Sequence, residues 1–304
     1  MLDVAAQRAS RGFARARWLA YLVSHRPGYV LGRFAAVRDV YSRFNWLKDQ
    51  FSGVPPLRVG ELYGKATVEI RAASSGLLVA DKPAKQQAAE MKAKAFSLGP
   101  QVRLEAVTRL REAAGTLPLE FDGKPIGTYG ELKAAPERYG RIAIATVSNS
   151  SALPDVRALA GDPALCEAAQ SFLGYRPRTV SSWLFWSFAN QLSDDERRAA
   201  YQTIDYHYDV DGFNFMYANF YLVDTTVRNG AHLLIEGSGR RKQLRHLMGV
   251  ARLSDAQAYE AYGRDAERKF EGPAGFGFLE DASCYHKALR PLDGERLMLQ
   301  LRYR

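Results

Sequence analysis

The spacing of apolar residues changes along the chain, and its first half follows a mostly helical period. Residues 1–50 read mainly as helix. Apolar positions at three- and four-residue spacing predict two further helices over residues 84–97 and 101–114. The stretches ATVEIRA (66–72) and RIAIATV (141–147) alternate in polarity, which predicts short strands.

Beyond Phe172 the pattern changes to short aromatic and β-branched runs separated by turn residues. Such runs predict β-strands, and only residues 240–249 and 255–269 interrupt them with helical sequence. The runs are RTVSSWLFWSF, FNFMYANFYLVD, AHLLIEG, GFGFL, ASCYHKAL and ERLMLQLRYR. Many short strands with turns between them are typical of a sandwich or a barrel.

The two patterns together predict an α+β chain whose helices pack on one outer face of a β core. We expect a single domain over residues 1–304. Within it, residues 1–130 would form a mainly helical part that packs on a core built from residues 140–304.

Two helix starts carry capping signals. Asp162 and Pro163 suit the N-cap and the first helical position, and Gly174 suits the residue after the helix. Ser193 and Glu196 have the spacing of a capping box, which predicts another short helix.

The composition indicates the cellular compartment and excludes several classes of protein. Hydrophobic residues make up 47% of the chain, which suits a sizeable core rather than a disordered chain. Cys166 and Cys284 have no CxxC spacing, so a reducing, cytoplasmic setting is expected. The first residues show no secretory signal, and the longest uncharged run, 179–193, is shorter than the ~20 residues of a membrane span.

The net charge of +9 is concentrated near the start of the chain. Residues 1–50 hold nine Arg or Lys and three Asp, interleaved with aromatic residues such as Trp18 and Trp46. One interpretation is peripheral contact with an anionic membrane surface or an anionic substrate. The other is a helical layer with a solvated basic face. Nucleic acid is not expected as a partner, because no nucleic-acid-binding motif accompanies the charge.

Candidate chemistry begins at the stretch YHYDVD, where His207 and Asp209 are separated by one residue. Side chains at positions i and i+2 of an extended chain project to the same side, so the pair could supply two metal ligands. A redox-active iron site of the facial type needs two imidazoles and one carboxylate. His286 is the best candidate for the third ligand, and His232 is the alternative. Arg296, ten residues after His286, could bind a carboxylate with both guanidinium nitrogens.

The segment HYDVDGFNFMYANFYLVDTTVRNGAHLLIEGSGRRK and the tail YHKALRPLDGERLMLQLRYR resemble the phytanoyl-CoA dioxygenase-like family of iron(II)/2-oxoglutarate oxygenases. The likeness covers about residues 160–304. It implies a double-stranded β-helix, or jelly roll, with O2 as co-reactant and with iron bound by three side chains and 2-oxoglutarate by two others. The implied iron ligands are His207, Asp209 and His286, and the implied 2-oxoglutarate contacts are Arg296 and Asn219.

Some positions leave alternatives to this assignment. Arg290 and Arg302 lie close enough in the sequence to compete with Arg296, and Gly239 stands where the family usually has a histidine. That histidine is not an iron ligand in the family, so its loss would alter loop packing or substrate contacts. Asp209 keeps the carboxylate that halogenating relatives lack, which favours hydroxylation.

The resemblance leaves the substrate open among several classes. Family relatives act on acyl-CoA, amino acids, phosphonates and sugars. The basic N-terminal segment favours an anionic small-molecule, sugar or lipid-linked substrate, such as the Kdo sugar of lipopolysaccharide at a membrane surface. The alternatives are an oxygenase of a soluble metabolite with no membrane contact, and a non-catalytic jelly-roll binding protein.

Overall fold

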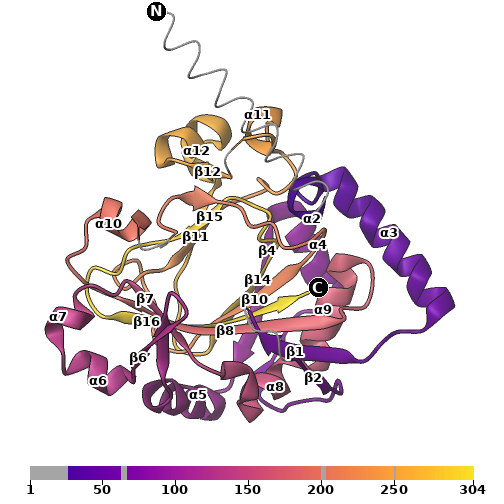
Figure 1. The fold of residues 1–304 in the computed structure, drawn as a ribbon. Helices are drawn as coiled ribbons and strands as arrows, with labels where there is room; N and C mark the ends of the chain where they lie inside the picture. The colour runs from indigo at the N-terminus through magenta and orange to yellow at the C-terminus, as the bar shows by residue number, and fades with distance from the viewer. Residues whose placement is uncertain (1–26, 63–66, 200–202, 250) are drawn as a thin grey trace, which may run out of the picture.

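The computed structural model describes residues 27–62, 67–199, 203–249 and 251–304, and shows two β-sheets with helices around them (Figure 1). Aromatic and aliphatic side chains of both sheets pack together between them, including Phe185, Met298, Leu234 and Phe270. The prediction of an α+β chain is therefore confirmed, and the strands of both sheets pair mainly in antiparallel fashion. Much of the N-terminal segment, Trp18 included, lies outside the described residues.

The larger sheet has eleven strands among the described residues, and nearly all its neighbouring pairs are antiparallel. Strand β1 is the exception, because it runs parallel to β8. In sheet order the strands are β3 (Leu78–Val79), β4 (Phe96–Val102), β14 (Phe276–Glu280), β10 (Met216–Tyr221), β16 (Glu295–Tyr303), β8 (Thr179–Phe188), β7 (Ile144–Val147), β5 (Leu119–Phe121) and β6 (Lys124–Gly127), with β1 (Leu57–Glu61) beside β8 and β2 (Thr67–Ile70) beside β1.

The smaller sheet has five strands among the described residues and carries the two histidines of the candidate site. His207 lies opposite His286 where β9 pairs with β15. The order is β12 (Arg252–Leu253), β9 (Tyr206–His207), β15 (His286–Ala288), β11 (His232–Ile235) and β13 (Glu267–Phe270).

Strand β16 lies at the centre of the larger sheet, between β8 and β10. Successive side chains of a strand point to opposite faces. One face of β16 buries three leucines in the core beneath the helices, while the other face lines a cavity between the sheets. The leucines are Leu297, Leu299 and Leu301, and the cavity-lining residues are Arg296, Met298, Gln300 and Arg302.

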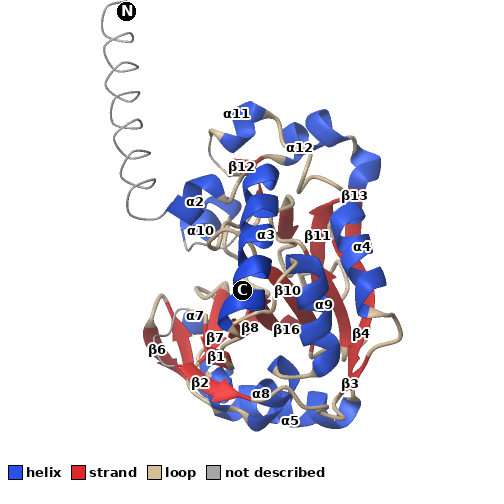
Figure 2. Ribbon diagram, turned by 90° about the vertical axis from the view of Figure 1, so that its right-hand side faces the viewer, coloured by secondary structure: helices blue, strands red, loops and turns tan. Residues whose placement is uncertain are grey.

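Helices cover the outer face of the larger sheet (Figure 2). Five of them, α4, α5, α6, α8 and α9, contribute buried apolar side chains to the main core cluster. The described helices are α2 (Pro27–Leu31), α3 (Ala35–Ser52), α4 (Ala84–Lys94), α5 (Leu104–Thr116), α6 (Tyr129–Lys133), α7 (Pro136–Tyr139), α8 (Pro154–Ala160), α9 (Pro163–Leu173), α10 (Asp194–Ala199), α11 (Leu244–Leu247) and α12 (Asp255–Tyr262), with 3-10 turns η1 (Ser150–Ala152) and η2 (Arg264–Ala266).

Both capping predictions are confirmed. The Asp162 carboxylate accepts a hydrogen bond from the Ala164 N–H at the start of α9, and Gly174 ends that helix in the left-handed conformation. The Ser193 hydroxyl accepts from the Glu196 N–H, and the Glu196 carboxylate accepts in return from the Ser193 N–H before α10.

The expectation of a mainly helical part at 1–130 needs correction, because its described portion also builds the larger sheet. Strands β1 to β6 all fall before residue 130, and β1 and β4 pair directly with β8 and β14 of the core. The helix predicted over 255–269 is also shorter: α12 ends at Tyr262, and strand β13 follows. Apolar spacing alone does not separate a short helix from a short strand, which explains both differences.

Two basic and two acidic side chains before residue 50 bind the core of the protein. Arg33 and Arg38 are buried, and their guanidinium groups donate hydrogen bonds to backbone carbonyls of the 239–249 loop. Asp39 pairs with Arg240 at 2.7 Å, and Asp49 with Arg178 at 2.7 Å. These contacts are those of a structural layer. In the described part of the chain, no helix is both long and apolar enough to span a membrane.

Candidate active site

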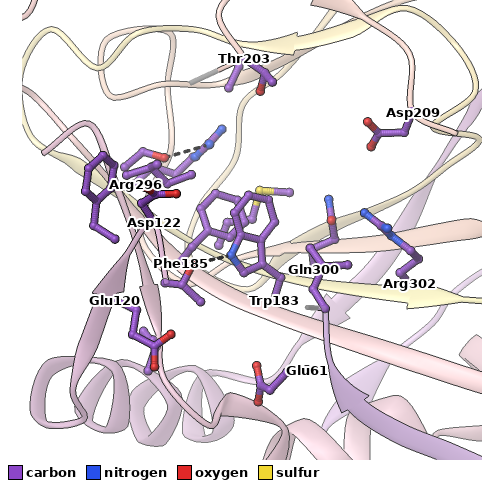
Figure 3. Close-up of a pocket in the computed structure, with 18 of the residues that line it drawn as sticks. Glu61, Glu120, Asp122, Trp183, Phe185, Thr203, Asp209, Arg296, Gln300 and Arg302 are labelled. Carbon is purple, nitrogen blue, oxygen red and sulfur yellow. Dashed lines mark hydrogen bonds between the residues drawn. The ribbon is translucent and has the colours of Figure 1, made fainter. Parts of the chain in front are cut away.

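The cavity between the sheets has a volume of about 830 Å³ and is lined from both of them. Figure 3 shows part of this lining, from the larger sheet together with Asp209. The smaller sheet contributes His207, His232 and His286. The larger sheet contributes the polar face of β16 and the aromatic side chains of β8. Among the residues predicted from the sequence, His207, Asp209, His286 and Arg296 all line this one space, although they are up to 89 positions apart in the chain.

Three of those side chains form a compact group of metal-ligating atoms. One atom each from His207, Asp209 and His286 lies within 4.8 Å of the other two. The His207 Nε2 is 3.8 Å from one carboxylate oxygen of Asp209, and the His286 Nε2 is 3.7 Å from the other. The donor set of two imidazoles and one carboxylate fits a divalent transition metal such as iron.

Backbone carbonyls hold both imidazole rings in the orientation that ligation requires. The Nδ1 of His207 lies 3.1 Å from the Asp205 carbonyl, and that of His286 lies 3.0 Å from the Cys284 carbonyl. A carbonyl oxygen only accepts, so each neutral ring carries its proton on Nδ1. The lone pair is then on Nε2, the atom nearest Asp209. Such outer hydrogen bonds are the usual means of fixing a metal-ligating histidine.

Asp209 is held from two sides. Its backbone N–H donates to the Ala282 carbonyl at 2.9 Å, which ties it to the segment just before His286. Its side chain accepts a hydrogen bond from the Tyr217 hydroxyl at 2.6 Å. These two contacts orient the carboxylate toward the histidines.

The pKa shifts at this end of the cavity favour the protonation states of metal ligands. Burial and the neighbouring His286 lower the pKa of His207 to about 4, so the ring is neutral at physiological pH. Burial alone would raise the pKa of Asp209, but His286, His207 and Arg302 outweigh it and hold this pKa below its usual value. A neutral imidazole and an ionised carboxylate are the forms that bind a metal.

Sequence reasoning missed Glu280, which lies fully buried behind the histidines on β14. Its carboxylate is 3.1 Å from the Nε2 of His232 and 3.5 Å from the Nδ1 of His286. Glu280 therefore supports His286 from the side opposite Asp209, and it also engages the Nε2 of His232. The strand pattern of GFGFL ends next to Glu280, but a lone carboxylate after a strand gave no signal.

Glu280, Cys284 and His286 form a second group of ligand atoms within 4.8 Å of one another. Burial and the neighbouring Glu280 raise the pKa of the Cys284 thiol well above its usual value, so the sulfur keeps its proton. The Glu280 carboxylate is already engaged by His232 and Asn219. This group suits a supporting layer better than a metal site.

Arg296 lines the cavity and is 3% exposed. Its guanidinium donates to the Gly230 carbonyl at 2.6 Å and the Ser187 hydroxyl at 3.1 Å, and its Nε has no hydrogen-bond partner. No carboxylate of the described residues lies within ion-pair distance of it. A buried cation without a counter-charge is costly, which makes this arginine a candidate for binding an anionic ligand.

The two competing arginines have different surroundings. Arg302 also lines the cavity, but it pairs with Asp211 at 2.9 Å and stacks over the Tyr217 ring. Arg290 lies outside the cavity, exposed, with Asp194 at 3.5 Å. Arg296 is thus the only one of the three that is both buried and without a carboxylate partner.

Asn219 does not lie where the resemblance implies. It is fully buried in β10 and is not among the residues that line the cavity. Its amide nitrogen donates to Glu280 at 3.0 Å, and its carbonyl oxygen accepts from Gln300 at 3.0 Å. This placement corrects the expected contact with 2-oxoglutarate: Asn219 supports Glu280 and Gln300, and Gln300 faces the cavity.

At Gly239, a histidine, as in the family that the sequence resembles, would require two neighbouring side chains to move. A Cβ there would lie 2.9 Å from a carboxylate oxygen of Asp281 and 3.3 Å from the Ser283 hydroxyl. The Gly239 carbonyl instead accepts hydrogen bonds from Arg38 and Lys242, both at 3.2 Å. Gly239 does not line the cavity, so it contributes to the packing of this loop.

The chain matches no protein-family model and no curated protein sequence. Among solved structures it is similar to the non-heme α-ketoglutarate-dependent epimerase SnoN from nogalamycin biosynthesis, at 16% identity and a TM-score of 0.47 over 72% of this chain and 80% of that chain. It is also similar to HygX from Streptomyces hygroscopicus, crystallised with nickel, 2-oxoglutarate and hygromycin B, at 14% identity and a TM-score of 0.48 over 72% and 86%. The apo form of the non-heme monooxygenase ThoJ matches at 18% identity and 0.45 over 71% and 76%.

Proposed function

We propose that this protein is an iron(II)- and 2-oxoglutarate-dependent oxygenase built on a double-stranded β-helix, as its resemblance to the phytanoyl-CoA dioxygenase-like family implies. One observation carries the proposal. Two imidazoles with free Nε2 atoms and a carboxylate converge in a cavity that also holds a buried arginine without a carboxylate partner among the described residues.

Each side chain has a defined part in this proposal. His207, Asp209 and His286 would hold the iron, and Arg296 would bind the distal carboxylate of 2-oxoglutarate. The bound iron, with 2-oxoglutarate and O2, would supply the oxidation of an unactivated C–H bond, coupled to decarboxylation of 2-oxoglutarate to succinate. Phe185 lies under the Arg296 guanidinium at 5.6 Å and helps to keep water away from it.

Hydroxylation is the reaction that we propose. Asp209 supplies the carboxylate ligand, so no ligand position is left for a halide as in halogenating relatives. A non-catalytic binding protein is the alternative, but loss of a ligand or of the arginine would be expected there, and all four side chains are in place.

The lining of the cavity and the contacts of the N-terminal segment bear on the anionic substrate and the membrane contact expected from the sequence. Acidic side chains line the cavity end away from Asp209, which disfavours an anionic substrate such as Kdo. The described basic residues Arg33 and Arg38 bind backbone carbonyls of the core, so they favour a structural layer over a membrane contact.

The direct test is calorimetric titration of 2-oxoglutarate into the full-length, iron-loaded protein without oxygen, followed by a succinate assay in air. We expect 2-oxoglutarate to bind only when iron is present, and we expect Asp209→Ala to abolish this iron-dependent binding. Binding of 2-oxoglutarate that is unchanged in Asp209→Ala, or no binding with iron present, would overturn the proposal.

A further inference from the structure

The cavity continues from the histidines to a second end lined by carboxylates. Glu61 ends strand β1, Glu120 lies in β5, and Asp122 is in the turn between β5 and β6. In Figure 3, Glu61 and Glu120 lie at the end away from Asp209, with Trp183 and Phe185 between. The acidic end therefore belongs to the space that a substrate of the metal site would occupy.

These carboxylates have no basic partner among the described residues, in a chain whose net charge is +9. Glu61 accepts hydrogen bonds from the Ser150 hydroxyl at 3.1 Å and from the Ser151 N–H, and Glu120 accepts from the Ser148 hydroxyl at 2.6 Å. Neutral donors orient these groups but leave their charge uncompensated. An ionised acceptor in that state favours a cationic donor.

The basic groups of the cavity are already assigned. Arg302 pairs with Asp211 at 2.9 Å, and Lys287 with Asp255 at 2.5 Å. Arg296 is buried with an unpartnered Nε and suits the carboxylate of the cosubstrate. The charge that remains for the substrate to neutralise is therefore negative.

An aromatic wall separates the two ends. Trp183 stacks on Phe185 with ring centroids 3.9 Å apart, and its indole N–H donates to the Thr146 hydroxyl at 2.8 Å. Thr146, Ser148 and Asn149 also line the cavity and add hydrogen-bonding groups. Aromatic faces beside carboxylates suit a protonated amine or the apolar face of a hydroxylated ring.

We propose that the substrate is a polar small molecule carrying one or more protonated amines. Glu61 and Glu120 bind the amine, the body of the molecule lies against Trp183, and a C–H group is thereby presented to the side chains around Asp209. This inference rests on the proposed oxygenase function for the reaction, but the amine site itself needs only Glu61, Glu120 and Trp183. The substrate class is the opposite in charge of the one that the basic N-terminal segment suggests.

The test is ligand-observed NMR titration of the full-length protein with matched probes. The glucosamine disaccharide and spermidine carry amines, cellobiose is neutral, and digalacturonate is anionic. We expect at least one amine probe to bind about tenfold or more tightly than cellobiose, digalacturonate to bind most weakly, and added salt to reduce the preference. Equal binding of the amine and neutral probes, or no binding of either amine probe, would overturn the proposal.

Variants that replace a carboxylate by an amide of the same shape test whether Glu61 and Glu120 bind the amine. The double variant Glu61→Gln/Glu120→Gln keeps the hydrogen-bond acceptors for the serines, so it should fold, and it should lose the preference for amines. Glu105→Gln, on the exposed surface of α5, is the matched control and should keep that preference. Preserved preference in the double variant would contradict the assignment.

The two proposals fail separately. Amine binding without any 2-oxoglutarate-dependent succinate would leave the amine site standing and reject the oxygenase function. Iron-dependent binding of 2-oxoglutarate without any preference for amines would reject the amine site and leave the oxygenase function standing.

Discussion

The two ends of the cavity are built in different ways. At the metal-ligand end, His207 and His286 come from paired strands of the smaller sheet, and each ring is hydrogen-bonded to a backbone carbonyl. At the acidic end, Glu61 and Glu120 come from strands before residue 130, and Asp122 lies exposed in a turn. Groups fixed by strand pairing and backbone hydrogen bonds suit a common reaction, while groups near strand ends and turns suit the choice of substrate.

The largest expected effect is loss of metal binding at the histidine end. His286→Ala or Asp209→Ala removes one of the three proposed ligands and should abolish tight binding of iron(II) or nickel(II), as measured by calorimetry on the full-length protein. His246→Ala is the matched control, because His246 lies outside the cavity. If His232→Ala abolishes metal binding and His286→Ala does not, the ligand assignment is wrong.

The second effect separates the two arginines of β16. Arg296→Ala should weaken 2-oxoglutarate binding by about 2–5 kcal/mol, or roughly thirtyfold or more, because the partner charge is buried. Iron binding should persist. Arg302→Ala should change the 2-oxoglutarate dissociation constant far less, since Arg302 already pairs with Asp211. The reverse ranking in titrations of iron-loaded variants would move the anchor to Arg302.

A smaller effect on metal affinity is expected from Glu280, which lies behind the proposed ligands. Glu280→Gln keeps the shape of the side chain but removes the charge that faces His286 and His232. Loss of such an outer partner typically lowers metal affinity about 10- to 100-fold. Metal titration and a thermal melt of the variant would measure affinity and folding separately. An unchanged affinity in a folded variant would show that Glu280 does not tune His286.

The smallest effect tests whether the two ends are independent. Glu61→Gln/Glu120→Gln should leave the dissociation constants of iron and 2-oxoglutarate within about twofold of wild type, because distant sites without shared partners act additively. Calorimetry with each ligand in turn provides the measurement. A large change in either dissociation constant would show that the two ends of the cavity are coupled and do not bind their ligands independently.

The sequence predicted the metal-ligand end better than the acidic end, for physical reasons. His207 and Asp209 share one face of an extended segment, and His286 and Arg296 fall in strand-like runs, so local pattern and resemblance both point to them. Glu61 and Glu120 reach the cavity only through pairing of β1 with β8 and of β5 with β7. That pairing depends on long-range contacts, which no local pattern records.

The same limit applies to the fold. Each of the six aromatic or β-branched runs after Phe172 contains a strand, because alternation and turn residues act over a few positions. The strands before residue 130 are short and lie between helices, so helical spacing dominates there. Asn219 shows the limit for a single residue: its strand is where it was expected, but its amide is used by Glu280 and Gln300.

The central place of β16 has a consequence for how the protein folds. Its neighbours β8 and β10 precede it in the chain by long stretches, as in the pairing of Leu184 with Leu299. Ordering these pairs requires closure of a long loop, which slows folding and raises contact order. Until β16 docks, β8 and β10 each keep an unpaired edge, and Arg296 and Arg302 have no cavity to line. We therefore expect the proposed metal site and the proposed anion site to appear in a late, concerted step of folding, and we expect refolding intermediates to be prone to edge-to-edge association.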